Sequence, residues 1–234
     1  MISLDPGFST IKWKVFSSSA RVMGCAGLLQ RSLCLLILGA VLPAAANPPL
    51  RSSFPGRRVG GGTRGECTAR LLVHLVPKNS VFAPDQGHLL GIMQGPTQAP
   101  KPLLIDFRRF AAAGTPAVIR NRIQRLRFAP SEAGLILFRT SVRDGVLWES
   151  SYQCQDPPPG VDMQSWDGGF DAPPAISLLL VEPTTVDRGY QDRLHALVDR
   201  CAGDVSKQDL INDFDLEVLD LRSWPDRLPV RCLF

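Results

Sequence analysis

The sequence predicts a mainly β protein, an antiparallel immunoglobulin-like sandwich with a small α/β extension at the C-terminus. Short apolar or alternating runs recur from residue 69 to residue 183 with turns between them, as in all-β domains. The 234 residues include 20 Gly and 20 Pro, and frequent Gly and Pro suit short strands better than long helices. Helical periodicity is strongest after residue 184.

The expected strands follow the chain in order. They are ARLLVHLVP (69–77), HLLGIMQG (88–95), PLLIDFRRF (102–110), IQRLRF (123–128), GLILFRTSV (134–142), VLWESSYQC (146–154) and AISLLLVEP (175–183). Asp144-Gly145 is a typical hairpin turn, so the two runs that flank it are expected to pair. In the second of these runs, Trp148 and Tyr152 share the face expected in the core, while Leu147 and Glu149 share the other.

A helix and a tail are expected at the C-terminus. Helical spacing in residues 186–203 relates Tyr190, Leu194, Leu197, Val198 and Cys201, and Gly203 is the expected stop. In the following segment, residues 209–221, apolar residues alternate with acids and predict a passage from helix to strand. The predicted layout is a signal peptide at 1–46, a lead-in rich in Pro, Arg and Gly at 47–66, the sandwich at 67–183, and the helix with its tail at 184–234.

Residues 1–46 have the layout of a secretory signal. Arg31 precedes an apolar run that ends in three alanines, and cleavage is expected after Ala46. The run is shorter than the ~20 residues of a membrane span, with an uncleaved anchor as the alternative. Residues 1–22 have no role in a signal of ordinary length, so translation is expected to start at Met23. The sequence thus predicts export to the periplasm or the medium, with membrane contact only through the transient signal peptide.

Charge gives little support for a nucleic-acid partner. The formal net charge is +4, but residues 1–46 hold four basic residues and one acid. The remainder of the chain is therefore nearly balanced, whereas a nucleic-acid-binding domain is typically strongly basic.

Four cysteines lie outside the leader, and export predicts that they form two disulfides. Three pairings are open, and we favour Cys67–Cys154 with Cys201–Cys232. Metal binding is not expected, because no two of these cysteines have CxxC spacing and no histidine clusters with them.

The most biased stretch of the chain is GRRVGGGTRGEC, from Gly56 to Cys67. Its glycines match the dinucleotide pattern GxGxxG, but that motif needs a preceding strand and a following helix, which are not expected here. Two interpretations stay open: backbone N–H groups and arginines that cup an anion, or glycines that fit a tight structural path. The candidate binding residues are Arg57, Arg58, Gly60, Gly61, Gly62, Thr63, Arg64 and Gly65.

The stretch PGRRVGGGTRGEC resembles the opening signature of a cyanobacterial family of exported proteins, domain of unknown function 928. In that family an Arg-Arg-x-Gly-Gly-Gly-x-Arg-Gly-x-Cys segment follows a signal peptide and precedes an all-β region with a later cysteine. Gly56–Cys67 carry the resemblance, and WESSYQC (148–154) is similar to the later aromatic–cysteine strand. The resemblance implies export, a β-rich body and an unassigned activity, and it brings no catalytic residues.

The sequence offers only weak candidates for catalysis. There is no GxSxG nucleophile elbow. His195 has Asp192 and Asp199 within about one helical turn, and Asp167 and Asp171 could face a sugar. We therefore predict a non-catalytic binding or envelope-associated module without cofactor or metal, whose partner is a protein, a polysaccharide or another polyanion met by the Arg/Gly segment. A secreted hydrolase acting on a polysaccharide and a structural accessory subunit of an envelope complex are the alternatives.

Overall fold

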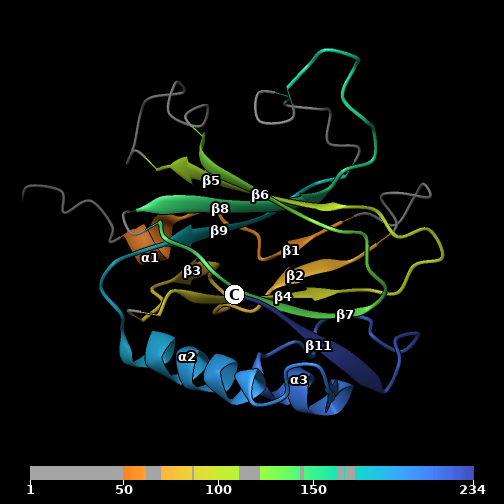
Figure 1. Ribbon diagram of the computed structural model, residues 1–234. Helices are drawn as coiled ribbons and strands as arrows, with labels where there is room; N and C mark the ends of the chain where they lie inside the picture. The colour runs from red at the N-terminus through yellow and green to blue at the C-terminus, as the bar shows by residue number, and fades with distance from the viewer. Residues whose placement is uncertain are drawn as a thin grey trace, which may run out of the picture. The chain divides into compact units, whose positions relative to one another are not determined.

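Two β-sheets face each other across a shared apolar core in the computed structural model (Figure 1). The structure describes residues 50–61, 70–85, 87–110, 122–142, 145–162, 166 and 172–234. The signal peptide expected at 1–46, with Met23 and Ala46, lies outside the described residues. No described helix is long and apolar enough to cross a membrane.

The larger sheet has six strands and combines the two halves of the chain. Its order is β1 (Val59–Gly60), β2 (Leu72–His74), β4 (Leu89–Gln94), β7 (Gly134–Arg139), β11 (Arg227–Leu233) and β10 (Asp204–Ser206). All neighbours pair antiparallel except β7 and β11, which run parallel. The C-terminal segment thus supplies two strands of this sheet.

The smaller sheet has five strands and carries most of the charged residues discussed below. Its order is β3 (Val81–Phe82), β9 (Ala175–Leu179), β8 (Val146–Tyr152), β5 (Leu103–Arg109) and β6 (Arg122–Phe128). Only β3 and β9 run parallel. Among the described strands, β6 forms one edge of this sheet.

Side chains alternate across each strand and fill the core between the sheets. On β8, Val146, Trp148 and Tyr152 belong to the core, as the sequence predicted for the two aromatic residues. The Trp148 ring stacks on His74 of β2 with ring centroids 3.6 Å apart, and it meets Phe138 of β7 edge to face at 5.9 Å. These contacts join the two sheets.

Helix α2 (Thr185–Val198) packs against the larger sheet, on the side away from β5 and β6 (Figure 1). Its buried face includes Tyr190, Leu194 and Leu197, as the helical spacing predicted. The helix begins with a capping box between Thr184 and Asp187, which satisfies backbone N–H groups at the first turn. The other helices are short: α1 (Leu50–Ser53) and α3 (Lys207–Asp213).

The mainly β class and the two facing sheets are confirmed, whereas the immunoglobulin-like arrangement stays a prediction. The purely antiparallel pairing is wrong, because β7 with β11 and β3 with β9 run parallel. The expected hairpin around Asp144-Gly145 is wrong, because β7 lies in the larger sheet and β8 in the smaller one. The connection therefore crosses from one sheet to the other. The strand expected after α3 is also not formed, since residues 214–220 are turns and irregular backbone.

The pairing expected between Cys201 and Cys232 is confirmed, with the two Cα atoms 5.6 Å apart. This disulfide joins the segment after α2 to β11. Cys154 is also disulfide-bonded, and its expected partner Cys67 lies outside the described residues.

Replacing both Cys201 and Cys232 by serine is expected to lower the free energy of unfolding by about 4 kcal/mol, because the cross-link closes a loop of 31 residues. Urea unfolding of the double variant and the parent protein measures the difference. Identical unfolding midpoints would contradict the prediction.

His74 is expected to make stability fall in acid. Its side chain is fully buried and burial lowers its pKa well below 6.5, whereas in the unfolded chain the pKa is about 6.5. Below about pH 6.5 the His74 side chain takes up a proton in the unfolded chain but not in the folded chain. The free energy of unfolding is therefore retained above about pH 7 and falls by up to about 1.4 kcal/mol per pH unit below about pH 6.5. Urea unfolding from pH 7.5 to 5.5 should show a shallower slope in His74→Gln, and equal slopes would refute this assignment.

Candidate functional site

The Arg/Gly segment is the stretch Gly56–Cys67, and its described part is hydrogen-bonded through its backbone to the strand β9. Arg57 and Ile176 exchange backbone hydrogen bonds, Arg57 N–H to Ile176 O at 2.9 Å and Ile176 N–H to Arg57 O at 2.7 Å. The exposed Arg57 guanidinium donates to Pro174 O at 3.0 Å. The segment therefore runs beside β9.

Arg58, by contrast, points inward, and its side chain is buried. Its guanidinium donates to three backbone carbonyls: Val76 O at 2.8 Å, Phe214 O at 2.9 Å and Asp215 O at 2.5 Å. These donors serve the protein's own backbone, so Arg58 joins β1 and the end of β2 to the chain after α3.

Gly60 and Gly61 occupy positions where a side chain does not fit. A Cβ at Gly60 would overlap the backbone at Ala175, and Gly61 has a φ of +91°, which L-residues with a side chain rarely adopt. The Gly61 N–H donates to Pro173 O at 2.9 Å. These contacts agree with the structural interpretation for residues 57–61, while Gly62, Thr63, Arg64 and Gly65 lie outside the described residues.

A second group of arginines gathers on the smaller sheet, and the sequence analysis missed it. We call β5 and β6 together the arginine-rich edge; it carries Arg108, Arg109, Arg122, Arg125 and Arg127. The only carboxylates on β5, β6 and β8 are Asp106 and Glu149, so positive charge is in excess here. The signal was present in the runs FRRF and RIQRLRF, which hold all five arginines. Alternation puts Asp106 and Arg108 on one face of β5, and Arg125 and Arg127 on one face of β6.

Asp106 is the centre of the contacts within this edge. Arg125 binds it with both arms of its guanidinium, Nε to Oδ1 and Nη2 to Oδ2, each at 2.7 Å. Arg108 Nη2 lies 3.1 Å from Oδ2, and Arg122 Nε lies 3.0 Å from Oδ1. Asp106 is 3 % exposed, and a carboxylate so buried requires this kind of charge compensation.

Glu149 lies next to Asp106 in the sheet, since the two residues are cross-strand partners. Arg108 Nε donates to Glu149 Oε2 at 3.0 Å. Burial raises the pKa of the Glu149 carboxyl, and the neighbouring Arg108 partly offsets that rise. Arg108 thus bridges both carboxylates and is committed to the protein's own acids.

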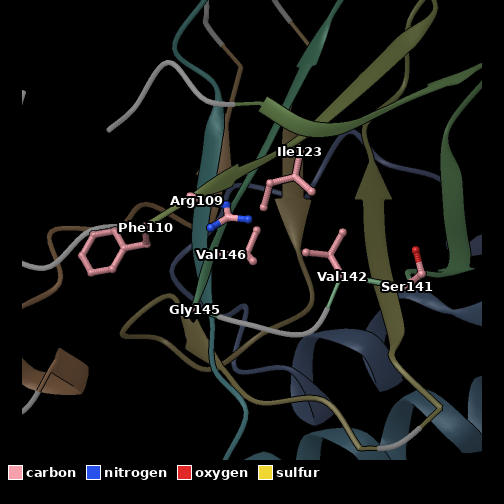
Figure 2. A pocket seen from close by; sticks show the side chains of 7 residues that line it. All are labelled: Arg109, Phe110, Ile123, Ser141, Val142, Gly145 and Val146. Atoms are coloured by element: carbon pink, nitrogen blue, oxygen red, sulfur yellow. The ribbon is translucent and has the colours of Figure 1, made fainter. Parts of the chain in front are cut away.

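A pocket of about 470 Å³ opens at the end of this edge (Figure 2). It is lined by Arg109, Phe110, Ile123, Ser141, Val142, Gly145 and Val146. The side chains of Ile123, Val142 and Val146 converge with the guanidinium of Arg109, while the Phe110 ring is turned away (Figure 2). That ring meets Phe54 edge to face at 5.7 Å. Its described lining is mostly apolar, with Arg109 as the one cationic side chain.

A second pocket, of about 600 Å³, lies against α2 and the loops after β3 and β9. At its side, His195 Nε2 lies 2.7 Å from Asp85 Oδ2. The carboxylate that His195 meets is thus Asp85 from the distant β3–β4 loop, not Asp192 or Asp199, which the sequence suggested. The candidate sugar-facing residues Asp167 and Asp171 lie outside the described residues.

No group of three or more His, Cys, Asp or Glu side chains within the described ranges could hold a metal ion. Comparisons with protein-family models, curated proteins and solved structures find no significant match to this chain. The resemblance of Gly56–Cys67 to domain of unknown function 928 therefore stays a prediction.

The two neighbouring arginines are expected to differ sharply on substitution. Arg58→Gln should lower the free energy of unfolding by about 2–4 kcal/mol, because three backbone carbonyls, two of them in buried contacts, lose a charged donor. The matched control Arg57→Gln should change it by less than about 1 kcal/mol, since that guanidinium is exposed and makes one hydrogen bond. Chemical denaturation measures both, and equal effects would show that Arg58 has no special structural role.

Proposed function

We propose that this chain is an exported, non-catalytic binding module that contacts an anionic partner through the arginine-rich edge. The observation that carries the proposal is the excess of five arginines over two carboxylates on three adjacent strands. Such a local excess attracts and orients polyanions even where the protein as a whole is nearly neutral.

The accessible charges are spread along the edge. Arg127 is exposed and Arg122 is partly exposed. The register of Leu104 with Arg127 and of Arg108 with Arg122 places these two arginines toward opposite ends of the β5–β6 pair, on the outer face that also carries Asp106. Seven residues of extended strand cover roughly 20 Å. The edge therefore suits an extended partner with repeated negative charges, such as a carboxylated polysaccharide.

Export is part of the proposal and is supported by cysteine usage. The Cys201–Cys232 bond and the bonded Cys154 suit an oxidising compartment such as the periplasm or the medium. The signal-like leader of the sequence points to the same destination. An immunoglobulin-like relationship of the two sheets belongs to the same proposal, since such sandwiches are frequent among exported binding modules.

The Arg/Gly segment stays a second proposed contact, and Arg57 is its exposed member within the described part of the chain. Arg58 adds little to such a contact, because its three hydrogen bonds are internal.

One observation favours the alternative of a secreted hydrolase: the His195–Asp85 pair beside the larger pocket. A histidine oriented by a carboxylate is one part of a nucleophilic site. Within the described ranges, the hydrogen-bond partners of His195 are Asp85 and Gln191, and neither is a nucleophile. The proposal of a binding module therefore takes precedence.

Charge reversal on the edge tests the proposal. Arg127→Glu should weaken binding of polygalacturonate, a carboxylated polysaccharide, by about three- to tenfold at low salt, with a smaller effect at high salt. The matched control Arg200→Glu makes the same change in net charge at an exposed position just beyond α2, and its affinity should be nearly unchanged. Isothermal titration calorimetry measures both.

Two outcomes would overturn the proposal. Equal losses in the two variants would show an effect of net charge alone. No binding of polygalacturonate by the parent protein at low salt would remove the edge as a site for carboxylated polymers. Circular dichroism confirms that each variant is folded.

A further inference from the structure

The pocket at the end of β5, β6 and β8 differs from the rest of the arginine-rich edge because its walls are apolar. Val146 is 1 % exposed and lies deep in the pocket, while Ile123 is 46 % exposed and lies toward the solvent. Val142 faces them (Figure 2). A volume of about 470 Å³ falls within the range of small-molecule sites, about 300–1,000 Å³. The polymer contact proposed above uses the length of the edge and does not need this pocket.

Arg109 is the cation of the pocket. Its neighbours Arg108 and Arg125 bind Asp106, and Arg127 donates to Gln153. Arg109 has no hydrogen-bond, ion-pair or ring partner among the described residues, and its guanidinium lies beside the three aliphatic side chains (Figure 2). The planar guanidinium of Arg109 is therefore available to donate two hydrogen bonds to a ligand.

The other polar groups of the pocket do not compete for this role. The Ser141 side chain points away from the converging aliphatic groups (Figure 2). The Gly145 carbonyl already accepts from the Phe110 N–H at 3.0 Å. Among the described lining residues, the free polar capacity at the centre of the pocket is therefore the single positive charge of Arg109.

We propose that this pocket binds an aliphatic monocarboxylate, with the carboxylate held by Arg109 and the aliphatic chain against Ile123, Val142 and Val146. A guanidinium and a carboxylate match in a two-bond fork. An aliphatic chain would cover the apolar walls and would exclude water from that ion pair, which strengthens the attraction. One guanidinium balances one negative charge, so the site selects a monoanion.

Octanoate and the neutral octan-1-ol are the matched probes for this site. The parent protein should bind octanoate more tightly than octan-1-ol. Arg109→Gln should weaken octanoate binding by about tenfold and leave octan-1-ol binding unchanged, because only the charge-assisted contact is lost. Ile123→Thr keeps a branched side chain but removes apolar surface, and it should weaken both probes. Arg200→Gln is the control with the same loss of charge. Isothermal titration calorimetry gives the affinities.

Methyl NMR spectra place the ligand independently. Octanoate should shift the methyl signals of Ile123, Val142 and Val146 in the parent protein. The proposal is overturned if Arg109→Gln binds octanoate as the folded parent does, or if the shifts fall elsewhere. Arg127→Glu, at the opposite end of the edge and outside the pocket lining, should weaken polygalacturonate binding and leave octanoate binding unchanged, so the two proposals fail independently.

Discussion

The structure depends on one constraint: each sheet must bury one face against the other. Trp148 at the centre of the smaller sheet stacks on His74 of the larger sheet and meets Phe138, so a single indole contacts two strands across the core. His74 is tolerated there because its Nδ1 lies 2.8 Å from Ser177 Oγ and because burial keeps the ring neutral. Everything charged on these strands must consequently face outward or lie at the ends.

This constraint explains the arginine-rich edge. On β5 the inward positions are Leu103, Ile105 and Phe107, so Asp106 and Arg108 share the outer face. Strand pairing then places Arg125 and Glu149 on either side of Asp106. Charges brought this close and removed from water are stable only as a compensated group, whereas Arg109, at the end of β5, has no ion-pair partner among the described residues.

Contacts between distant segments fix residues 51–58 and the segment after residue 184 onto the sheets. Arg58 holds carbonyls 156 and 157 residues further along the sequence. Asp187 caps α2 and also pairs with Arg51 Nη2 at 2.8 Å, which attaches the helix to α1. The Cys201–Cys232 bond adds a covalent link to β11. The segment after residue 184 is therefore part of the larger sheet's framework rather than a separate appendage.

The sequence alone determined features that depend on local periodicity. Alternation placed Trp148 and Tyr152 in the core, helical spacing identified the buried face of α2, and cysteine spacing with context favoured Cys201–Cys232. The two predictions from strand and helix periodicity succeed because backbone geometry fixes how often a side chain returns to the same face. Asp144-Gly145 misled, since a turn residue reports a change of direction and not which sheet the next strand joins.

Only the tertiary structure decided which way each arginine points and what it meets. Arg57 and Arg58 are neighbours in the sequence, yet one is exposed and the other is buried and donates to three backbone carbonyls. The grouping around Asp106, the pairing of His195 with Asp85 and the pocket beside Arg109 all join residues from separate strands, helices or loops. Such contacts arise from strand order and register between distant segments, and local sequence pattern carries no information about either.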